Sequence, residues 1–339
     1  MIKEAIGNLV SGNSLTMEEA SSVMEEIMDG AATQAQLGAF LVALKLKGET
    51  SDEVAGLASV MRSRSNRVQV SGPVIDIVGT GGDGSNTFNI STTAAFVMAG
   101  AGLKVAKHGN RAMSSRCGSA DVLEALGVKI ELTPEQVRNC VDNVGIGFMF
   151  AQAFHPAMKY AAAPRREIGV PTVFNILGPL TNPAGAQYQV IGVPSPEIGD
   201  KIASAACRLG MKRAMVVHGL NGIDELSISG QSLIWEIKDE QITSARKHIR
   251  PEDLGLNSAD GDSVLGGTPQ ENATITRSVL NGERSARRDV VLLNAAAGIY
   301  IGGMTGSLTD AVSIASAAID NGKAADKLDQ LILFCRGLQ

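Results

Sequence analysis

The sequence predicts an α/β protein in which a small all-helical domain precedes a large α/β domain with a mainly parallel central sheet. Two observations lead to this prediction. The first part of the chain carries only helix signals, and from Val74 onward short β-rich runs alternate with helical patterns, as is typical of βα units. We therefore expect a helical domain over residues 1–70 and an α/β domain over residues 71–339, with a segment near residues 165–185 as a candidate to join the helical domain.

Three capping boxes mark the helical start. In each, a threonine hydroxyl accepts a hydrogen bond from a backbone N–H of the first turn, and an acid or amide three residues later bonds back. The pairs are Thr16 with Glu19, Thr33 with Gln36, and Thr50 with Glu53. Their regular spacing permits a repeat array or three short helices of similar length, and we favour the three helices.

Strand and helix patterns then alternate along the chain. The expected strands are residues 74–78, 103–106, 188–193 and 214–217. The expected helices between them are residues 91–99, 120–126, 134–144 and 197–209. A hairpin over residues 226–228 and 233–237 follows, and the end of the chain is expected to be helical over residues 294–301, 308–319 and 324–334.

The composition excludes several classes of function. The 339 residues carry 30 Lys and Arg against 35 Asp and Glu, a formal net charge of −5, and only 4% are aromatic. A surface that follows nucleic-acid phosphates normally leaves a basic excess and stacking aromatics, so we expect no nucleic-acid partner. No apolar stretch is long enough for a bilayer, no secretory signal is visible and the four cysteines lack C-x-x-C spacing, which together predict a cytoplasmic protein with no membrane partner.

The strongest motif is the glycine-rich stretch of residues 76–92, in which an apolar strand runs into a loop and then into a helix. Glycines let the backbone turn sharply and bring N–H groups close to an anion, and the helix start adds its own free N–H groups. Asp83, Asn89, Ser91 and Thr92 supply further polar groups. The motif is neither a Walker A loop nor a standard dinucleotide loop, and we favour an anion site over a tight turn without a ligand.

A second polar loop, residues 107–111 (Lys-His-Gly-Asn-Arg), follows the next expected strand. Loops that follow parallel strands meet at one edge of the sheet, so this loop is expected beside the glycine-rich one. Lys107 and Arg111 could neutralise phosphates there. A solvated basic loop is the alternative.

Two further clusters give weaker signals. Asp224 and Glu225 follow a strand and offer the hard oxygen ligands that suit Mg²⁺. An isolated Asp-Glu pair is, however, usually a solvent-exposed pair without a binding role. Arg165 or Arg166 could bind a substrate carboxylate, or could simply pair with Glu167. No Ser/His/Asp, Cys/His or His cluster stands out, so positioning of phosphates, metal and acceptor is favoured over covalent catalysis.

Taken together, these motifs resemble the anthranilate phosphoribosyltransferase family. The resemblance rests on residues 79–83, 89–92, 107–111, 174–183 and 224–225 and runs from the helical start to residues 293–297. It implies a nucleoside phosphorylase/phosphoribosyltransferase-like fold and a homodimer joined through the helical domains. It also implies Mg²⁺-dependent transfer of the 5-phosphoribosyl group from phosphoribosyl pyrophosphate to the amine of anthranilate in tryptophan biosynthesis. The products would be N-(5-phosphoribosyl)anthranilate and pyrophosphate, with no covalent enzyme intermediate.

Carried over position by position, the resemblance implies three groups of site residues. Phosphoribosyl pyrophosphate would be held by Gly79, Gly82, Asp83, Thr87, Asn89, Ile90, Ser91, Thr92, Lys107, His108, Gly109, Asn110, Arg111, Ser114, Ser115 and Ser119. Anthranilate would contact Gly79, Asn110, Arg165, His108, His155 and Gly178. Ser91, Asp224 and Glu225 would take Mg²⁺, with two ions per subunit. No residue is expected to act as a nucleophile.

Two alternatives remain open from the sequence. A pyrimidine nucleoside phosphorylase would share the architecture and also react at ribose C1, but it would use phosphate as nucleophile and a Ser-Gly-Arg type of loop in place of residues 107–111. A non-catalytic, nucleic-acid-binding relative would be expected to have a basic surface and to lose the metal-binding acids. This chain keeps Asp224 and Glu225 and is net acidic.

Overall fold

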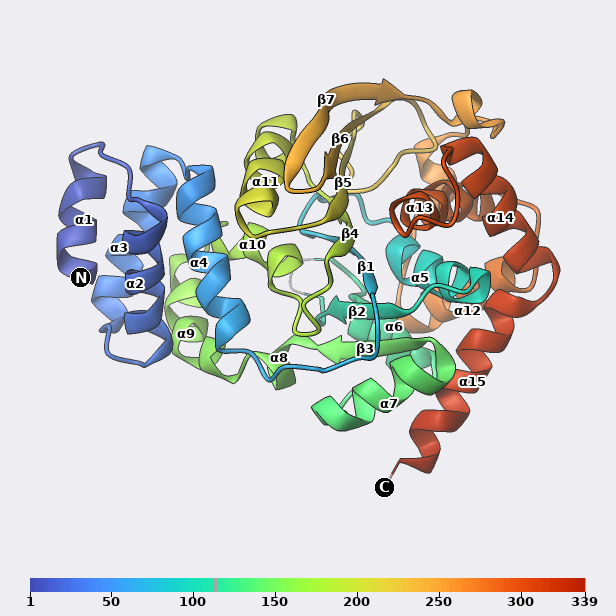
Figure 1. The fold of residues 1–339 in the computed structure, drawn as a ribbon, viewed down its shortest axis with the longest axis horizontal. Coiled ribbons are helices and arrows are strands. Elements are labelled where there is room, and N and C mark those ends of the chain that lie inside the picture. The colour runs from blue at the N-terminus through green and yellow to red at the C-terminus, as the bar shows by residue number, and fades with distance from the viewer. Residues whose placement is uncertain (113–114, 339) are drawn as a thin grey trace.

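A computed structural model describes residues 1–112 and 115–338, which build a central sheet flanked by helices, with a helical bundle at one end (Figure 1). The strands are β1 (Ile75–Gly79), β2 (Val105–Gly109), β3 (Ile146–Phe150), β4 (Tyr188–Gly192), β5 (Arg213–Gly219), β6 (Ser232–Lys238) and β7 (Gln241–Ile249). The helices up to the middle of the chain are α1 (Ile2–Val10), α2 (Met17–Met28), α3 (Gln34–Lys47), α4 (Ser51–Ser63), α5 (Ile90–Ala101), α6 (Ser119–Leu126), α7 (Pro134–Val144), α8 (Ala151–Phe154) and α9 (Lys159–Ile168). Those that follow are α10 (Phe174–Leu177), α11 (Pro196–Arg208), α12 (Pro269–Leu280), α13 (Ala286–Ile301), α14 (Leu308–Asp320) and α15 (Lys323–Gly337).

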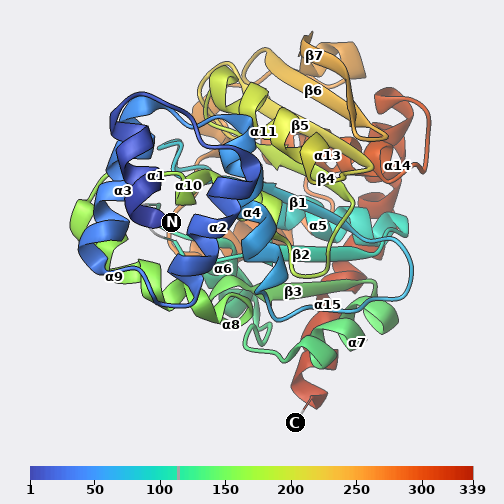
Figure 2. The same ribbon diagram turned by 60° about the vertical axis from the view of Figure 1, so that its left-hand side comes forward.

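The helical bundle forms as the sequence predicts. All three threonine capping boxes are present at the starts of α2, α3 and α4. The acid of the third, Glu53, is buried and also accepts hydrogen bonds from Leu15 N (2.9 Å) and from Lys47 Nζ (2.9 Å), so it joins three elements of the bundle. Helices α9 and α10, from the middle of the chain, lie against α1–α4 (Figure 2).

The sheet has the order β3-β2-β1-β4-β5-β6-β7. Strands β1 to β5 are parallel, and β6 and β7 add an antiparallel edge. The predicted α/β class with a mainly parallel sheet is therefore confirmed. The predicted hairpin is wrong in one arm, because residues 226–228 form no strand and β6 pairs instead with β7.

Each face of the sheet has its own core, which follows from the two-residue period of a strand. Along β5, Met215 and Val217 face the core that also contains α5, α7 and α12–α15. Ala214 and Val216 face the other core, which contains α11 and continues into the helical bundle. Burial on both faces explains the continuous apolar runs that mark the strands.

The strand order reverses direction next to β1. From β1 the chain proceeds to β2 and β3 on one side, whereas β4 and β5 lie on the other side. In open parallel sheets, ligands bind beyond the carboxyl ends of the strands at such a reversal. This edge carries the glycine-rich loop after β1. Within the described residues, no helix is long and apolar enough to cross a membrane.

Candidate active site

The glycine-rich loop after β1 turns repeatedly through left-handed backbone. Gly81, Gly82, Gly84 and Asn86 have φ of +71°, +75°, +74° and +53°, conformations that glycine adopts without steric cost and asparagine tolerates. Among the described residues, the amides of Gly82, Asp83 and Gly84 donate to no protein acceptor. Three consecutive N–H groups are thus left for a ligand, which suits an anion.

Asp224 lies directly over the end of β1. Its Oδ2 accepts a hydrogen bond of 2.6 Å from the amide of Gly81. A Cβ placed on Gly79 would lie 2.2 Å from this Oδ2, and a Cβ on Gly192, at the end of β4, would lie 1.5 Å from the Asp224 backbone oxygen. Glycine is required at both strand ends because the Asp224 segment approaches the backbone so closely.

Three carboxylates converge beside the loop. Asp224 N donates to Asp83 Oδ2 at 3.2 Å, and Glu225 Oε1 accepts from Ser91 N at 2.9 Å, in the first turn of α5. Glu225 Oε2 is buried and has no hydrogen-bond partner in the described part of the chain. Burial and the Asp83 carboxylate raise the pKa of Asp224 to about 7, and burial with the Asp224 charge raises the pKa of Glu225 well above its ordinary value. Lys107 offsets only part of the pKa shift at Glu225.

The donor set fits Mg²⁺. No group of three or more His, Cys, Asp or Glu side chains in the described part of the chain forms a complete metal cage. Mg²⁺ does not require one, because it is commonly held by one or two carboxylates together with waters and substrate phosphate oxygens. Asp224, Glu225 and the Ser91 hydroxyl supply hard oxygen donors next to the free loop amides.

Beneath the loops lies a buried polar network that joins the predicted site residues Lys107 and His108 to Asp76 and Asn182, which the sequence analysis did not assign to the site. The Asp76 carboxylate accepts from His108 N (3.3 Å) and from Asn182 Nδ2 (2.7 Å), and Lys107 Nζ donates to the Ile77 carbonyl (2.5 Å). Burial, offset in part by Lys107, raises the pKa of Asp76 to about 6. The network ties the end of β2, where residues 107–111 begin, to β1. The sequence feature that could have indicated this network is Asp76, an acidic residue within an apolar strand.

Two histidines predicted for the anthranilate half lie together. The rings of His108 and His155 have centroids 5.0 Å apart, and both side chains are buried. Neither Nε2 has a hydrogen-bond partner within residues 1–112 and 115–338. Burial lowers the pKa of His108 to about 3 and that of His155 to about 4, and the backbone of Gly178 offsets only part of the shift at His108. Both imidazoles are therefore neutral at pH 7.

Arg165 on α9 stacks over the Phe174 ring, with its guanidinium carbon 5.0 Å from the ring centroid. It is half-buried, and no carboxylate among the described residues pairs with it or with its exposed neighbour Arg166. The alternative that these arginines pair with Glu167 is thus not what the described residues show. Burial lowers the pKa of Arg165. A desolvated cation with no acid partner is suited to a carboxylate ligand.

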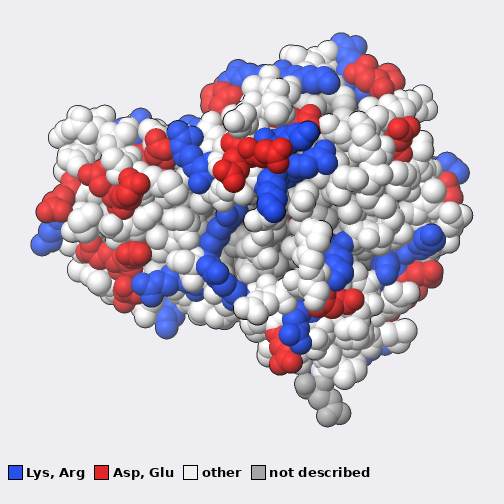
Figure 3. All heavy atoms as spheres, in the orientation of Figure 1, with Lys and Arg blue, Asp and Glu red and all other residues white. Residues whose placement is uncertain are grey.

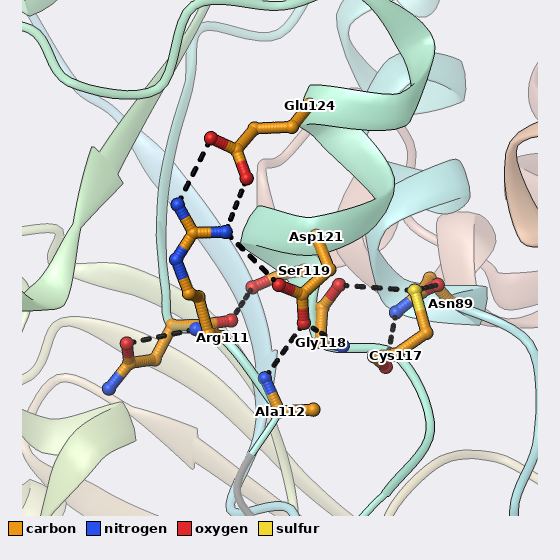
Figure 4. Close-up of polar contacts among 9 residues, drawn as sticks. Asn89, Arg111, Ala112, Cys117, Gly118, Ser119, Asp121 and Glu124 are labelled. Atoms are coloured by element: carbon orange, nitrogen blue, oxygen red, sulfur yellow. Dashed lines mark hydrogen bonds and ion pairs between the residues drawn. The ribbon is translucent and has the colours of Figure 1, made fainter. Parts of the chain in front are cut away.

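Asn110 and Arg111 make different kinds of contact with α6: a backbone hydrogen bond and ion pairs, respectively (Figure 4). The Asn110 carbonyl accepts from Ser119 Oγ (3.2 Å) at the start of α6, which holds the loop against that helix. Arg111 forms ion pairs with Asp121 and Glu124 on α6 and stacks on Phe150. Its charge is therefore neutralised within the protein, so Lys107 is the cation of this loop that lies without a direct carboxylate pair.

Asn89 connects the glycine-rich loop to two distant segments. Its Oδ1 accepts from Asn272 Nδ2 (2.9 Å) and its Nδ2 donates to the Cys117 carbonyl (3.2 Å; Figure 4). Asn272, on α12, was not predicted as part of the site. The Gly266 amide bonds to the Asn86 carbonyl (2.9 Å), so the segment before α12 also closes over the loop.

The remaining predicted residues lie around this centre. Thr87 Oγ1 contacts Ser85 Oγ at 3.4 Å, Ile90 and Thr92 are buried in the first turn of α5, and Ser115 is exposed. Gly109 lies against Ser119, since a Cβ there would be 2.1 Å from its Oγ. Ser114 lies outside the described residues.

Comparison with family models assigns most of the chain to two domains of one family. Residues 3–65 match the helical bundle domain of the glycosyl transferase family, and residues 71–325 match the α/β domain of the same family.

Named relatives agree with this match. Anthranilate phosphoribosyltransferases of Dehalococcoides mccartyi and Chloroflexus aurantiacus are 60% and 56% identical over 100% and 99% of this chain, and 99% of each relative is covered. A crystal structure of the Thermus thermophilus enzyme superposes with a TM-score of 0.93 at 45% identity, over 98% of this chain and 99% of that one. The Saccharomyces cerevisiae enzyme in complex with phosphoribosyl pyrophosphate and Mg gives a TM-score of 0.90 at 28% identity, over 99% and 98%.

Proposed function

This chain belongs to the anthranilate phosphoribosyltransferase family, and from that premise we propose that it transfers the 5-phosphoribosyl group of phosphoribosyl pyrophosphate to the amine of anthranilate. The family predicted from the sequence motifs is thereby confirmed. The products would be N-(5-phosphoribosyl)anthranilate and pyrophosphate, a step of tryptophan biosynthesis. The full-length relatives are transferases, and none of the observations above favours a nucleoside phosphorylase.

The observation that carries this proposal is the set of free amides at Gly82, Asp83 and Gly84 beside the unpartnered carboxylate oxygen of Glu225. When pyrophosphate leaves ribose C1, negative charge grows on the departing group and positive charge grows on the sugar. Fixed N–H donors stabilise the developing negative charge without reorganising. Ser91, Thr92 and Asn89 at the start of α5 would complete the donor-binding half.

Mg²⁺, when bound, would neutralise charge on the leaving pyrophosphate. Asp224, Glu225 and Ser91 are the residues of this chain that fit it, and two ions per subunit is our proposal. Support comes from the yeast relative, whose structure is a complex with phosphoribosyl pyrophosphate and Mg, and from the placement of Asp224 and Glu225, two buried carboxylates whose pKa values are raised by burial and by neighbouring acids.

The acceptor half would bind anthranilate between the buried histidines and Arg165. Arg165 would pair with the anthranilate carboxylate, and Asn110, Gly79 and Gly178 would line the approach to the sugar. A yeast relative in complex with 4-fluoroanthranilate supports a site of this kind in the family. The arylamine is neutral at pH 7, so its attack on the sugar requires no strong base. The imidazoles of His108 and His155 are also neutral and so add no charge next to the aromatic ring.

We further propose a cytoplasmic homodimer joined through the helical domains, with residues 1–70 as that domain. Apolar side chains on the bundle surface support the dimer: Val10 on α1 and Val42 and Leu46 on α3 are exposed. Exposed apolar groups that share one region of a surface favour a protein–protein contact.

A fluorescence assay tests the activity directly. The protein is mixed with anthranilate, phosphoribosyl pyrophosphate and Mg²⁺, and the loss of anthranilate fluorescence is followed. We expect a decay that requires all three components. A flat trace, with turnover only when a pyrimidine nucleoside and phosphate are supplied, would assign the protein to the phosphorylases instead.

A further inference from the structure

A second cavity lies at the opposite edge of the sheet from the candidate active site. Its volume is about 500 Å³, which is within the usual range for a small-molecule site. It is lined by residues just before β1 (67–70), just before β4 (182–187) and just before β5 (209–211), together with Arg62 at the end of α4. The cavity therefore opens at the amino ends of the strands, where the helical bundle meets the sheet. We call it the amino-edge cavity.

The lining of the amino-edge cavity is cationic. It contains Arg62 and Arg67 and no Asp or Glu. The face in Figure 3 shows Lys and Arg along the boundary between the helical bundle and the rest of the molecule, next to a hollow. Two positive charges without a compensating acid in the lining favour occupation by an anion.

Two backbone carbonyl groups hold the Arg62 guanidinium in place. Its Nε donates to the Leu180 carbonyl (2.6 Å) and one Nη donates to the Leu209 carbonyl (3.2 Å). These two bonds use two of its five N–H groups, and no carboxylate of the described chain pairs with it. Burial lowers the pKa of Arg62, which reflects the cost of this desolvated charge. A fixed guanidinium with spare donors is ready to bind an oxyanion.

The other lining groups are mainly polar. Val68, Ala186 and Met211 belong to the lining but are almost fully buried, whereas Gln69 and Gln187 present exposed amides. Arg67 is exposed and makes no hydrogen bond or ion pair within the described residues. A lining that is more polar than apolar suits a ligand held through charged and hydrogen-bonding contacts.

We propose that the amino-edge cavity binds a small molecule that carries one anionic group, a phosphate monoester or a carboxylate. Arg62 and Arg67 bind the anionic group, and the exposed amides of Gln69 and Gln187 contact the rest of the molecule. The site is separate from the proposed transferase centre, because that centre lies at the carboxyl ends of the same strands.

Calorimetric titration tests this proposal with two probes, phenyl phosphate and cyclohexanecarboxylate. Phosphoribosyl pyrophosphate and Mg²⁺ are kept saturating, without anthranilate, to occupy the carboxyl-edge site. We expect at least one probe to bind once per chain. Arg67→Gln should weaken that binding about fivefold, since a partly solvated charged contact is lost. Tighter binding of one probe identifies phosphate or carboxylate as the preferred group.

The matched control is Arg64→Gln. Arg64 is exposed like Arg67 and lies three residues away, but it pairs with Asp29 and does not line the cavity. Its substitution should leave probe binding unchanged. Binding of neither probe, or equal binding by the wild type and by Arg67→Gln, would overturn the proposal. This comparison does not depend on what the carboxyl-edge site binds, so it stands apart from the transferase assay.

Discussion

The two halves of the candidate active site satisfy their polar groups in opposite ways. In the donor half, the backbone amides of residues 82–84 and Glu225 Oε2 have no hydrogen-bond partner among the residues that the structure describes. In the acceptor half, His108 and His155 are buried as neutral rings and Arg165 rests on the Phe174 ring. One half therefore offers fixed charge and dipoles, and the other offers buried uncharged rings with one cation.

This difference matches the different demands of two substrates. A diphosphate needs many N–H donors and a cation, whereas a flat aromatic acid needs apolar walls and a single partner for its carboxylate. Variants in one half should therefore affect one substrate more than the other. The predictions below test that separation.

The largest effect is expected from removing both metal-binding acids with Asp224→Asn and Glu225→Gln. We expect kcat/KM to fall by about 100-fold or more, because electrostatic stabilisation of the leaving group is lost. The Mg²⁺ concentration for half-maximal rate should also rise. The matched control is Asp239→Asn with Glu240→Gln, an exposed Asp-Glu pair in the turn between β6 and β7. An unchanged Mg²⁺ titration in the first variant would show that these acids do not bind the metal.

A smaller loss is expected from Gly79→Ala. The added methyl group would lie 2.2 Å from Asp224 Oδ2 and must displace that carboxylate, so we expect kcat/KM to fall by about 30-fold with the fold retained. Gly7→Ala in α1 is the control, because a Cβ there meets no atom within 4 Å. Full activity of Gly79→Ala, with circular dichroism of the native form, would contradict the close packing of Asp224 on β1.

Arg165→Ala should act on the acceptor half alone. We expect KM for anthranilate to rise about tenfold, since one charge-assisted contact is lost, and KM for phosphoribosyl pyrophosphate to stay within about twofold. Arg166→Ala, which changes the exposed neighbour, should leave both constants near wild type. If Arg165→Ala weakened both substrates equally, the carboxylate role would be rejected.

The smallest effect concerns the pH dependence of stability. With pKa values of about 3 and 4 in the folded protein, His108 and His155 bind fewer protons than their unfolded counterparts near 6.5. The unfolded state therefore gains protons as pH falls from about 6.5 to 4, and this pair lowers stability over that window. Asp76, whose pKa is raised to about 6, has the opposite slope.

Urea unfolding at several pH values separates these contributions. His155→Gln should lose less free energy of unfolding than the wild type between pH 6.5 and 4, because one of the two buried histidines is removed. Nuclear magnetic resonance of the wild type should show no titration of His108 or His155 between pH 5 and 8. A midpoint near 6.5 for either ring would mean that it is solvated and not buried against its neighbour.

Much of this site could be predicted from sequence because its residues sit in loops directly after apolar strands. Asp83, Asp224 and Glu225 belong to such loops, Ser91 lies in the first turn of the helix that follows one of them, and the structure brings the four to one edge. Asp76 and Asn272 were missed because their roles depend on contacts between segments far apart in the chain. Strand β7 was missed because it is exposed along nearly its whole length and shows no apolar alternation, and the five-residue strand β3 lacks flanking polar loops.

A crystal structure with phosphoribosyl pyrophosphate and Mg²⁺ tests the central claim most directly. We expect the pyrophosphate oxygens to lie against the amides of Gly82, Asp83 and Gly84, with Mg²⁺ near Asp224 and Glu225. Ribose C1 should face the acceptor half, on the side of His108. Density for the sugar donor at any other place, or none at all with both compounds saturating, would contradict this account.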